Sequence, residues 1–139
     1  NPYLRKVIII GASENLITHV SPNYRQTVEF YSEQSLQHEA SWKQFSNETI
    51  DTPVYISVDK DVLNPQSAVT NWDQGCLTLN ELEHLLSIIL KHEKIIGIDI
   101  CGECSSTLNI FEAEKGTQLD NTANQELLNL FLNCQTSNL

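Results

Sequence analysis

The sequence has 139 residues, which is enough for one domain with a hydrophobic core. Its 18 acidic residues outnumber its 8 lysines and arginines, and the net charge of −10 argues against binding to nucleic acids or to anionic membrane surfaces. It has no apolar run of the roughly 20 residues that cross a membrane, and we expect no signal peptide, because the polar start does not lead into an apolar segment.

The first third of the chain predicts two strands and a short helix. The run Lys6–Ile10 is almost wholly apolar and ends at Gly11, which is typical of a strand buried on both faces. The segment Thr27–Tyr31 alternates between polar and apolar residues, so it predicts a second strand nearer the edge of a sheet. Residues 33–47 are polar with a few large apolar side chains, and we expect a short helix there.

The middle of the chain predicts a third strand followed by a long loop. Val54–Val58 is rich in β-branched and aromatic residues, as buried strands are. The loop Asn64–Gly75 has about a dozen residues, and loops of that length in compact domains are often functional. Its Trp72 has a large apolar area, so we expect it to anchor the loop by packing rather than to line a pocket.

The last part predicts a helix, a strand and a second helix. Thr78 and Glu81 form a capping box that begins a helix, in which leucines and isoleucines recur at helical spacing up to Leu90. The run Ile95–Ile100 predicts a fourth strand, with Gly97 where we expect a helix to pack closely. We expect the polar stretch 104–120 to be irregular and the last helix to run over residues 121–134.

Strands that alternate with helices predict an α/β fold with a parallel sheet and right-handed crossovers. We expect a single α/β domain over residues 1–139, with Ile8, Ile56 and Ile98 buried in it. The sequence contains no methionine, so we expect that Asn1 is not a natural translation start and that these residues belong to a longer protein. The four cysteines fall in predicted core elements, which favours reduced thiols in a cytoplasmic protein.

Three acidic residues follow the predicted strands: Asp59, Asp61 and Glu103. In an extended backbone Asp59 and Asp61 point to the same face and Lys60 points to the other. The carboxyl ends of parallel strands meet at one edge of a sheet, so we expect all three acids to converge there. Neighbouring carboxylates repel each other unless a cation neutralises them, and oxygen ligands suit hard divalent ions such as Mg²⁺ and Mn²⁺.

A longer pattern surrounds these acids. The run S-V-D-K-D-V-L-N-P at residues 57–65 resembles the S-x-D-x-D-x-x-D-P signature of the ureohydrolase family, which includes arginases, agmatinases and formimidoylglutamases. A G-x-L-T turn at residues 75–78 and the segment I-D-I-C-G-E at residues 98–103 follow in the same order as in that family. The resemblance is good over residues 50–134 and looser before them. It implies a three-layer parallel β-sheet flanked by helices, as in arginases and deacetylases, with this chain forming the C-terminal part of the domain.

The resemblance also implies roles for the three acids. Asp59 and Asp61 would be ligands of a binuclear manganese centre, and Glu103 would bind the guanidinium group of a small cationic guanidino substrate. A planar guanidinium pairs well with a carboxylate, which supports the role of Glu103 on physical grounds. The chain departs from the family's pattern in three ways: Asn64 replaces the third acid, Lys60 replaces an apolar residue, and Glu103 comes one residue late.

The family's other metal ligands come from an earlier histidine and a D-x-H-x-D strand, and this motif does not occur in the 139 residues. Water activation by a metal requires a full coordination shell. We therefore expect these 139 residues by themselves to bind Mn²⁺ weakly and to release no urea from arginine or agmatine. The pair Cys101 and Cys104 has C-x-x-C spacing, but it lacks the second pair of a zinc site and the position of a redox motif.

Two other interpretations remain open at this point. An apolar strand followed by D-x-D also resembles the haloacid-dehalogenase phosphatases, in which the first aspartate is the nucleophile and Mg²⁺ is bound beside it. A non-catalytic regulatory or interaction domain would leave the acids as solvated turn residues. Metal binding distinguishes both enzymes from the third class, and the choice of metal and substrate distinguishes the enzymes from each other. Assembly into a homo-oligomer is also left open.

Overall fold

A computed structural model describes residues 3–38, 47, 50–104 and 110–136, and for residues 110–113 and 135–136 it describes the backbone alone. The chain divides into two compact units, Asn1–Asn47 and Glu48–Leu139, and each is described by itself. The predicted single domain over residues 1–139 therefore stays a prediction.

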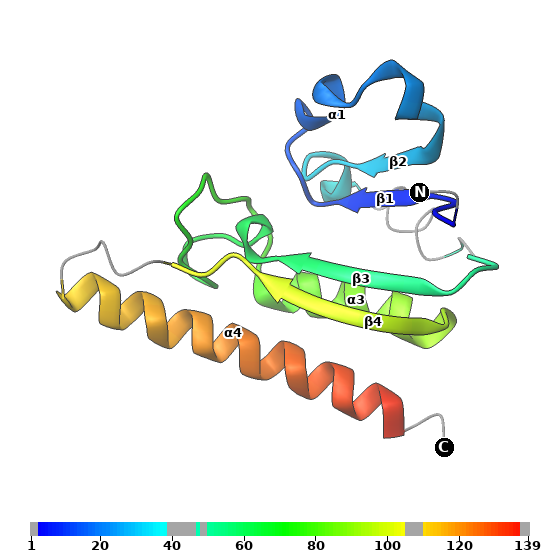
Figure 1. Ribbon diagram of the computed structural model, residues 1–139. Helices are drawn as coiled ribbons and strands as arrows, with labels where there is room; N and C mark the ends of the chain where they lie inside the picture. Colours follow the sequence, from blue (N-terminus) through cyan, green and yellow to red (C-terminus); the bar gives the residue numbers. More distant parts are fainter. Residues whose placement is uncertain (1–2, 39–46, 48–49, 105–109, 137–139) are drawn as a thin grey trace. The chain divides into compact units, whose positions relative to one another are not determined.

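The first unit is built around two short parallel strands, β1 (Val7–Ile10) and β2 (Val28–Tyr31) (Figure 1). Their register pairs Val7 with Val28 and Ile10 with Tyr31, which confirms both predicted strands. The short helix α1 (Leu16–His19) and a 3-10 helix (Pro22–Thr27) connect them.

Of the helix predicted over residues 33–47, the structure describes a 3-10 turn at Ser35–Gln37. Residues 39–46 of that prediction lie outside the described residues.

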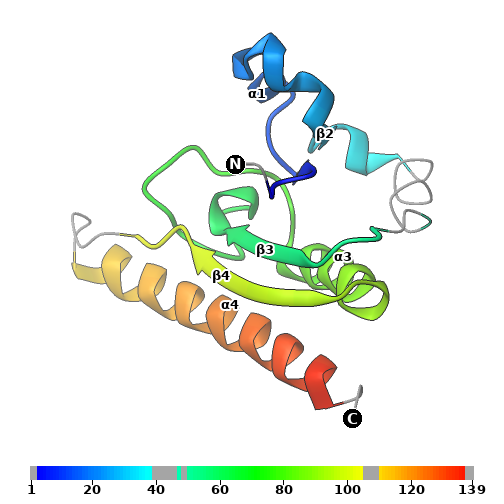
Figure 2. The same cartoon turned by 45° about the vertical axis from the view of Figure 1, so that its right-hand side comes forward.

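The second unit contains the parallel strands β3 (Val54–Asp59) and β4 (Ile95–Cys101), connected by the helix α3 (Leu79–His92). The long helix α4 (Ile110–Thr136) lies beside the pair and contacts α3 (Figures 1 and 2). Along β3 the side chains alternate between buried and exposed, so both helices cover one face of the pair. The structure therefore confirms an α/β unit with parallel strands, while the three-layer arrangement stays a prediction.

Leucines and other apolar residues from both helices and from β3 form the core of this unit. Thr78 begins α3 with the predicted capping box: its hydroxyl accepts from the Glu81 amide, and the Glu81 carboxylate accepts from the Thr78 amide at 2.8 Å. The Thr78 amide and the Thr78 hydroxyl both donate to the Glu81 carboxylate, and these two hydrogen bonds lower the pKa of Glu81. Ile56 is buried as predicted, whereas Ile8 and Ile98 are half-buried. The buried hydrophobic side chains from α3 and α4 are Leu82, Leu85, Leu86, Leu90, Ala123, Leu127 and Phe131.

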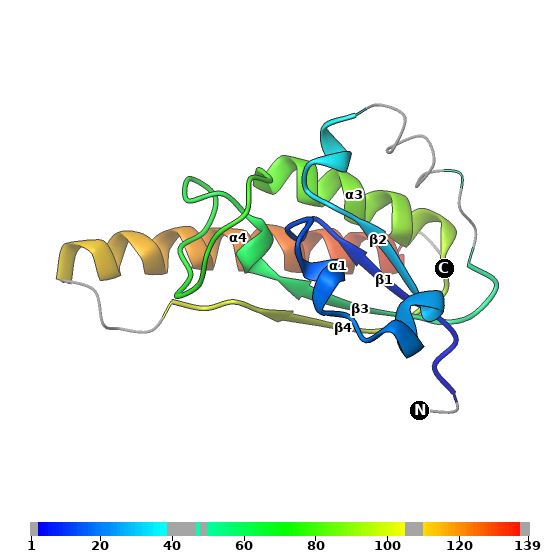
Figure 3. The same ribbon diagram turned by 90° about the horizontal axis from the view of Figure 1, so that it is seen from above.

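The start of the last helix was predicted wrongly. Helix α4 begins at Ile110, so residues 110–120 are helical rather than irregular. The polar sequence and Gly116 disfavour a helix locally, but a contact from a distant part of the chain supports this one. A Cβ at Gly116 would lie 3.4 Å from the Cβ of Val69, so the glycine lets the helix approach the loop after β3 closely. Figure 3 shows α4 extending past the ends of β3 and β4 to that loop.

Two further expectations of close packing were also wrong. Gly97 does not lie against a helix, because the ring of Tyr55 on the paired strand covers it: a Cβ there would lie 2.6 Å from a ring carbon. Trp72 is 77% exposed, so it does not anchor its loop by packing. Within the described ranges, no helix is both long enough and apolar enough to span a membrane.

Candidate functional site

The candidate site begins where β3 ends. Asp59 is the last residue of the strand, and the chain then turns through a 3-10 helix at Lys60–Val62. The Asp59 carboxylate caps this turn by accepting a hydrogen bond from the Asp61 amide at 3.1 Å. Asp59 is exposed and Lys60 is fully buried, which confirms that the two side chains point to opposite faces.

Asp61 carries an oxygen that suits a cation. Its Oδ1 is buried, and no described residue donates a hydrogen bond to it. A buried carboxylate oxygen without a donor is costly, and a bound divalent cation would remove that cost. No group of three or more metal-ligating side chains occurs among the described residues. Asp59 and Asp61 therefore fit two ligands of a hard divalent ion, and these described residues do not complete a site.

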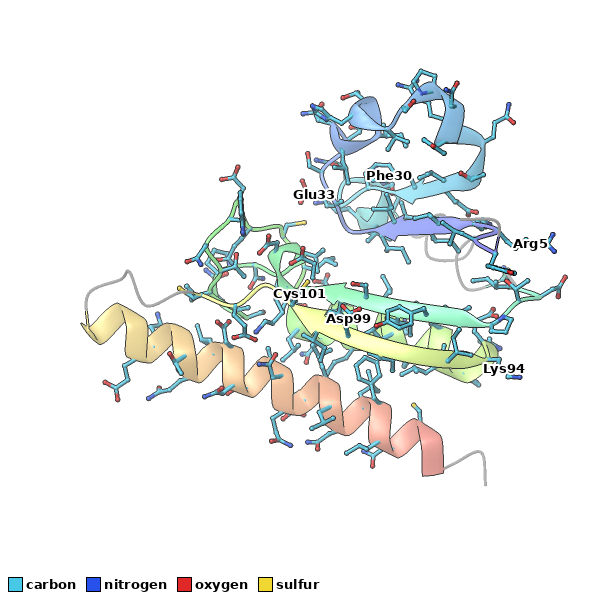
Figure 4. The ribbon with its side chains drawn as sticks, viewed as in Figure 1. Arg5, Phe30, Glu33, Lys94, Asp99 and Cys101 are labelled. Carbon is cyan, nitrogen blue, oxygen red and sulfur yellow. The ribbon has the colours of Figure 1, made fainter. Side chains whose placement is uncertain are left out.

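The C-terminal half of β4 carries a second set of polar groups, which includes Asp99 and Cys101 (Figure 4). Asp99 pairs in register with Ser57, and the Ser57 hydroxyl donates to Asp99 Oδ1 at 2.7 Å. Partial burial raises the pKa of the Cys101 thiol, and the carboxylates of Asp59, Asp99 and Asp61 raise it further. A thiol in such surroundings is a weak nucleophile. The expectation that the C-x-x-C pair is not a redox motif stays a prediction.

All four cysteines are free thiols, but none is buried, so their predicted placement in the core was wrong.

Gly102 turns the chain sharply after β4. Its φ of 87° is a left-handed backbone conformation that residues with a side chain rarely adopt. A Cβ at this position would lie 2.8 Å from Asp59 Oδ1 and 2.9 Å from the Lys60 amide nitrogen, so only glycine lets the ends of the two strands pack this closely. The turn interrupts strand alternation before Glu103. It gives a physical reason for the late position of that acid.

Among the described residues, Glu103 does not join the two aspartates in a group of three side chains that could hold a metal ion. Its Oε1 accepts from the ammonium of Lys60 at 2.6 Å and from the side-chain amide of Asn124 at 3.0 Å. Lys60 Nζ also lies 3.9 Å from Oδ1 of the buried Asp120 on α4. The hydrogen bonds from Lys60 and from Asn124 hold the pKa of Glu103 below its ordinary value, and the bond from Lys60 has the larger effect. We call Lys60, Glu103, Asp120 and Asn124 the lysine cluster.

The loop after β3 is fastened to the lysine cluster and by hydrogen bonds within the segment 63–74. The Asp120 carboxylate accepts from the backbone amides of Val69 and Cys104 at 3.0 and 3.4 Å. The side-chain amide of Gln74 donates to the carbonyls of Leu63 and Ala68. These bonds give the loop a defined path, which leaves Trp72 exposed on it.

Sequence spacing predicted Asp59, Asp61 and Glu103 as site residues, and their roles stay predictions. It missed that Lys60 contacts Glu103, and it missed Asp120 and Asn124. One signal was present: Lys60 continues the buried positions Ile56 and Val58 at a spacing of two, where a charged side chain requires an ionic partner. No local signal identified Asp120, because that residue lies in the stretch predicted to be irregular.

Parallel strands with carboxylates at their C-terminal ends are typical of α/β enzymes that bind metals or substrates at that edge. A comparison with family models identifies which class this is: a model of the arginase family matches residues 2–117. The chain belongs to the arginase family, which is a family of hydrolases of the ureohydrolase type. This confirms the resemblance found in the sequence.

One relative among known proteins is an uncharacterized protein of Thermotoga maritima, which is 47% identical over 51 residues. The aligned stretch is 37% of this chain and 20% of that relative, so the chain spans a small part of the relative's length. The comparison with solved structures found no match. Family membership favours the ureohydrolase interpretation over the haloacid-dehalogenase one.

Proposed function

We propose that this chain forms part of a manganese-dependent hydrolase of the arginase and agmatinase type, which cleaves a linear C–N bond of a guanidino or amidino compound. Asp59 and Asp61 are two of its metal ligands, and Glu103 receives the cationic group of the substrate. The proposal includes a cytoplasmic location, which the free cysteines support.

The observation that carries the proposal is the buried Oδ1 of Asp61, which receives no hydrogen bond from any described residue. It lies directly after the strand that ends in Asp59, within the stretch matched by the arginase family. When bound, manganese ions supply a water of lowered pKa. The chain's own groups hold the ions and the substrate: two carboxylates for the cations, and a third carboxylate for the substrate's positive charge.

The proposal is tested on the full-length protein, with arginine, agmatine and formimidoylglutamate as substrates. We expect one of them to be hydrolysed when Mn²⁺ is present and not after chelation. Asp61→Asn should lower kcat by about a hundredfold, because an amide holds a divalent ion less well than a carboxylate. Asp73→Asn, which neutralises an exposed aspartate in the adjacent loop, is the matched control and should leave kcat unchanged.

Glu103→Gln separates the roles of the acids. It should raise KM and leave the manganese content unchanged, because the amide keeps the shape of the side chain but loses its charge. Loss of manganese in this variant would make Glu103 a ligand instead, and unchanged kinetics would assign the substrate's cation to another acid. Hydrolysis of a phosphate ester with Mg²⁺, abolished by Asp59→Asn, would contradict the proposed reaction.

A further inference from the structure

A fully buried lysine occupies the turn between the two candidate metal ligands. The Lys60 side chain has no exposed surface, whereas that of Glu103 is 58% exposed. A buried ammonium requires ionic or hydrogen-bonding partners. The partners are Glu103 from the end of β4 and Asp120 from α4, so the lysine cluster connects three elements of the unit.

The contacts of Glu103 use one of its two carboxylate oxygens. Both the Lys60 ammonium and the Asn124 amide donate to Oε1, at 2.6 and 3.0 Å. No described residue donates to Oε2. A guanidinium pairs most strongly with a carboxylate when two parallel N–H groups meet the two oxygens. At Glu103 one of those two positions is already taken by a cation of the chain itself.

The charge of the cluster still favours a cationic ligand. Two carboxylates, those of Glu103 and Asp120, face one ammonium, so the cluster keeps one negative charge in excess. Asp120 is fixed by two backbone amides and is buried, while Glu103 is the acid that solvent and ligands reach. A positive ligand can therefore approach Glu103, but it meets a single available oxygen.

We propose that Lys60 is a specificity-determining residue: by holding Oε1 of Glu103, it leaves the ligand only the other oxygen of that acid and excludes two-pronged pairing with a guanidinium. This inference rests on the proposed function insofar as Glu103 is the acid that receives the substrate. The ligand class that fits is a cation that presents one N–H to Glu103. In such a contact a guanidinium has no advantage over a primary ammonium.

The test compares guanidinium and methylammonium chloride as probes, at concentrations below those that unfold the protein. Each is titrated into full-length protein labelled with carbon-13 at the glutamate carboxyls, and the shift of the Glu103 resonance is followed. We expect similar dissociation constants for the two probes in the wild type. In Lys60→Met/Asp120→Asn, which removes one buried positive and one buried negative charge together, guanidinium should gain about threefold over methylammonium.

Asp120→Asn alone is the matched control. It keeps the contact between Lys60 and Glu103, so it should keep the wild-type ratio. The pKa of Glu103 gives a second readout: it should rise toward its ordinary value in the double variant and stay low in the control.

The proposal is overturned if guanidinium is preferred to the same degree in all three proteins, or if neither probe shifts the Glu103 resonance in the double variant. The titration needs no manganese, so these results are independent of whether the full-length protein hydrolyses any C–N bond.

Discussion

Replacing Lys60 with alanine is expected to lower the free energy of unfolding by about 3 kcal/mol. The substitution leaves the buried Asp120 without its cationic neighbour, and it removes a fully buried side chain from beneath the end of β3. Both losses act in the same direction. Chemical denaturation with a fit of the midpoint and slope measures the effect.

The charge-balanced variant Lys60→Met/Asp120→Asn serves as the control for this stability change. It fills nearly the same space with an apolar chain and removes the buried anion, so it should recover most of the lost stability. If Lys60→Ala and the double variant lose equal stability, the unpaired Asp120 is not the cause.

The stabilising effect of the Lys60 contact on Glu103 should depend on pH. The folded-state pKa of Glu103 is lowered, so its contribution is fully present above its unfolded pKa, about 4.3. It is lost as the pH falls through the lower folded-state value. The wild type should therefore lose stability in this acidic range more steeply than the variant Glu103→Gln.

Gly102→Ala is the second substitution with a large expected effect. A residue with a side chain at this left-handed φ costs about 1 to 2 kcal/mol, and the added Cβ would meet Asp59 Oδ1 and the Lys60 backbone at less than 3.0 Å. Because backbone must move to relieve that contact, we expect a total loss of about 3 kcal/mol. Thermal or chemical denaturation measures it.

Gly116→Ala is the matched control for Gly102→Ala. Gly116 lies inside a helix, and a Cβ there would lie 3.4 Å from the Cβ of Val69, which is close to an ordinary van der Waals contact. Alanine is favoured over glycine in a helix by about 1 kcal/mol, so this variant should be as stable as the wild type or slightly more stable. A similar loss of stability in both variants would mean that the left-handed conformation and close contacts of Gly102 are not the cause.

The elements that local signals define were predicted well. The apolar runs gave β1, β3 and β4, and the capping residues Thr78 and Glu81 gave the start of α3. The signals for these elements lie within each segment, in the pattern of its apolar residues and in its capping side chains, so they could be read although the strands pair with distant partners.

The features that were missed depend on residues far apart in sequence. The first turns of α4 are supported by the contact of Gly116 with Val69, and Glu103 is held by Lys60, 43 residues away. The alternation of β3 predicted that Lys60 points away from Asp59, and the structure confirms it, but alternation could not identify what Lys60 meets. The late position of Glu103 required a local irregularity, and the left-handed Gly102 supplies it.

The most direct test of the central claim is to locate manganese by its paramagnetic effect on the nuclear magnetic resonance spectrum of the full-length protein. At substoichiometric Mn²⁺ we expect the amide resonances of Asp59, Asp61 and Cys101 to broaden first, because the two aspartates are the proposed ligands and Cys101 pairs with Asp59 across the strands. Asp59→Asn/Asp61→Asn should remove this broadening at the same Mn²⁺ concentration, and Asp73→Asn should keep it. Equal broadening in the double variant, or broadening centred on another part of the chain, would contradict the assignment of these two aspartates as metal ligands.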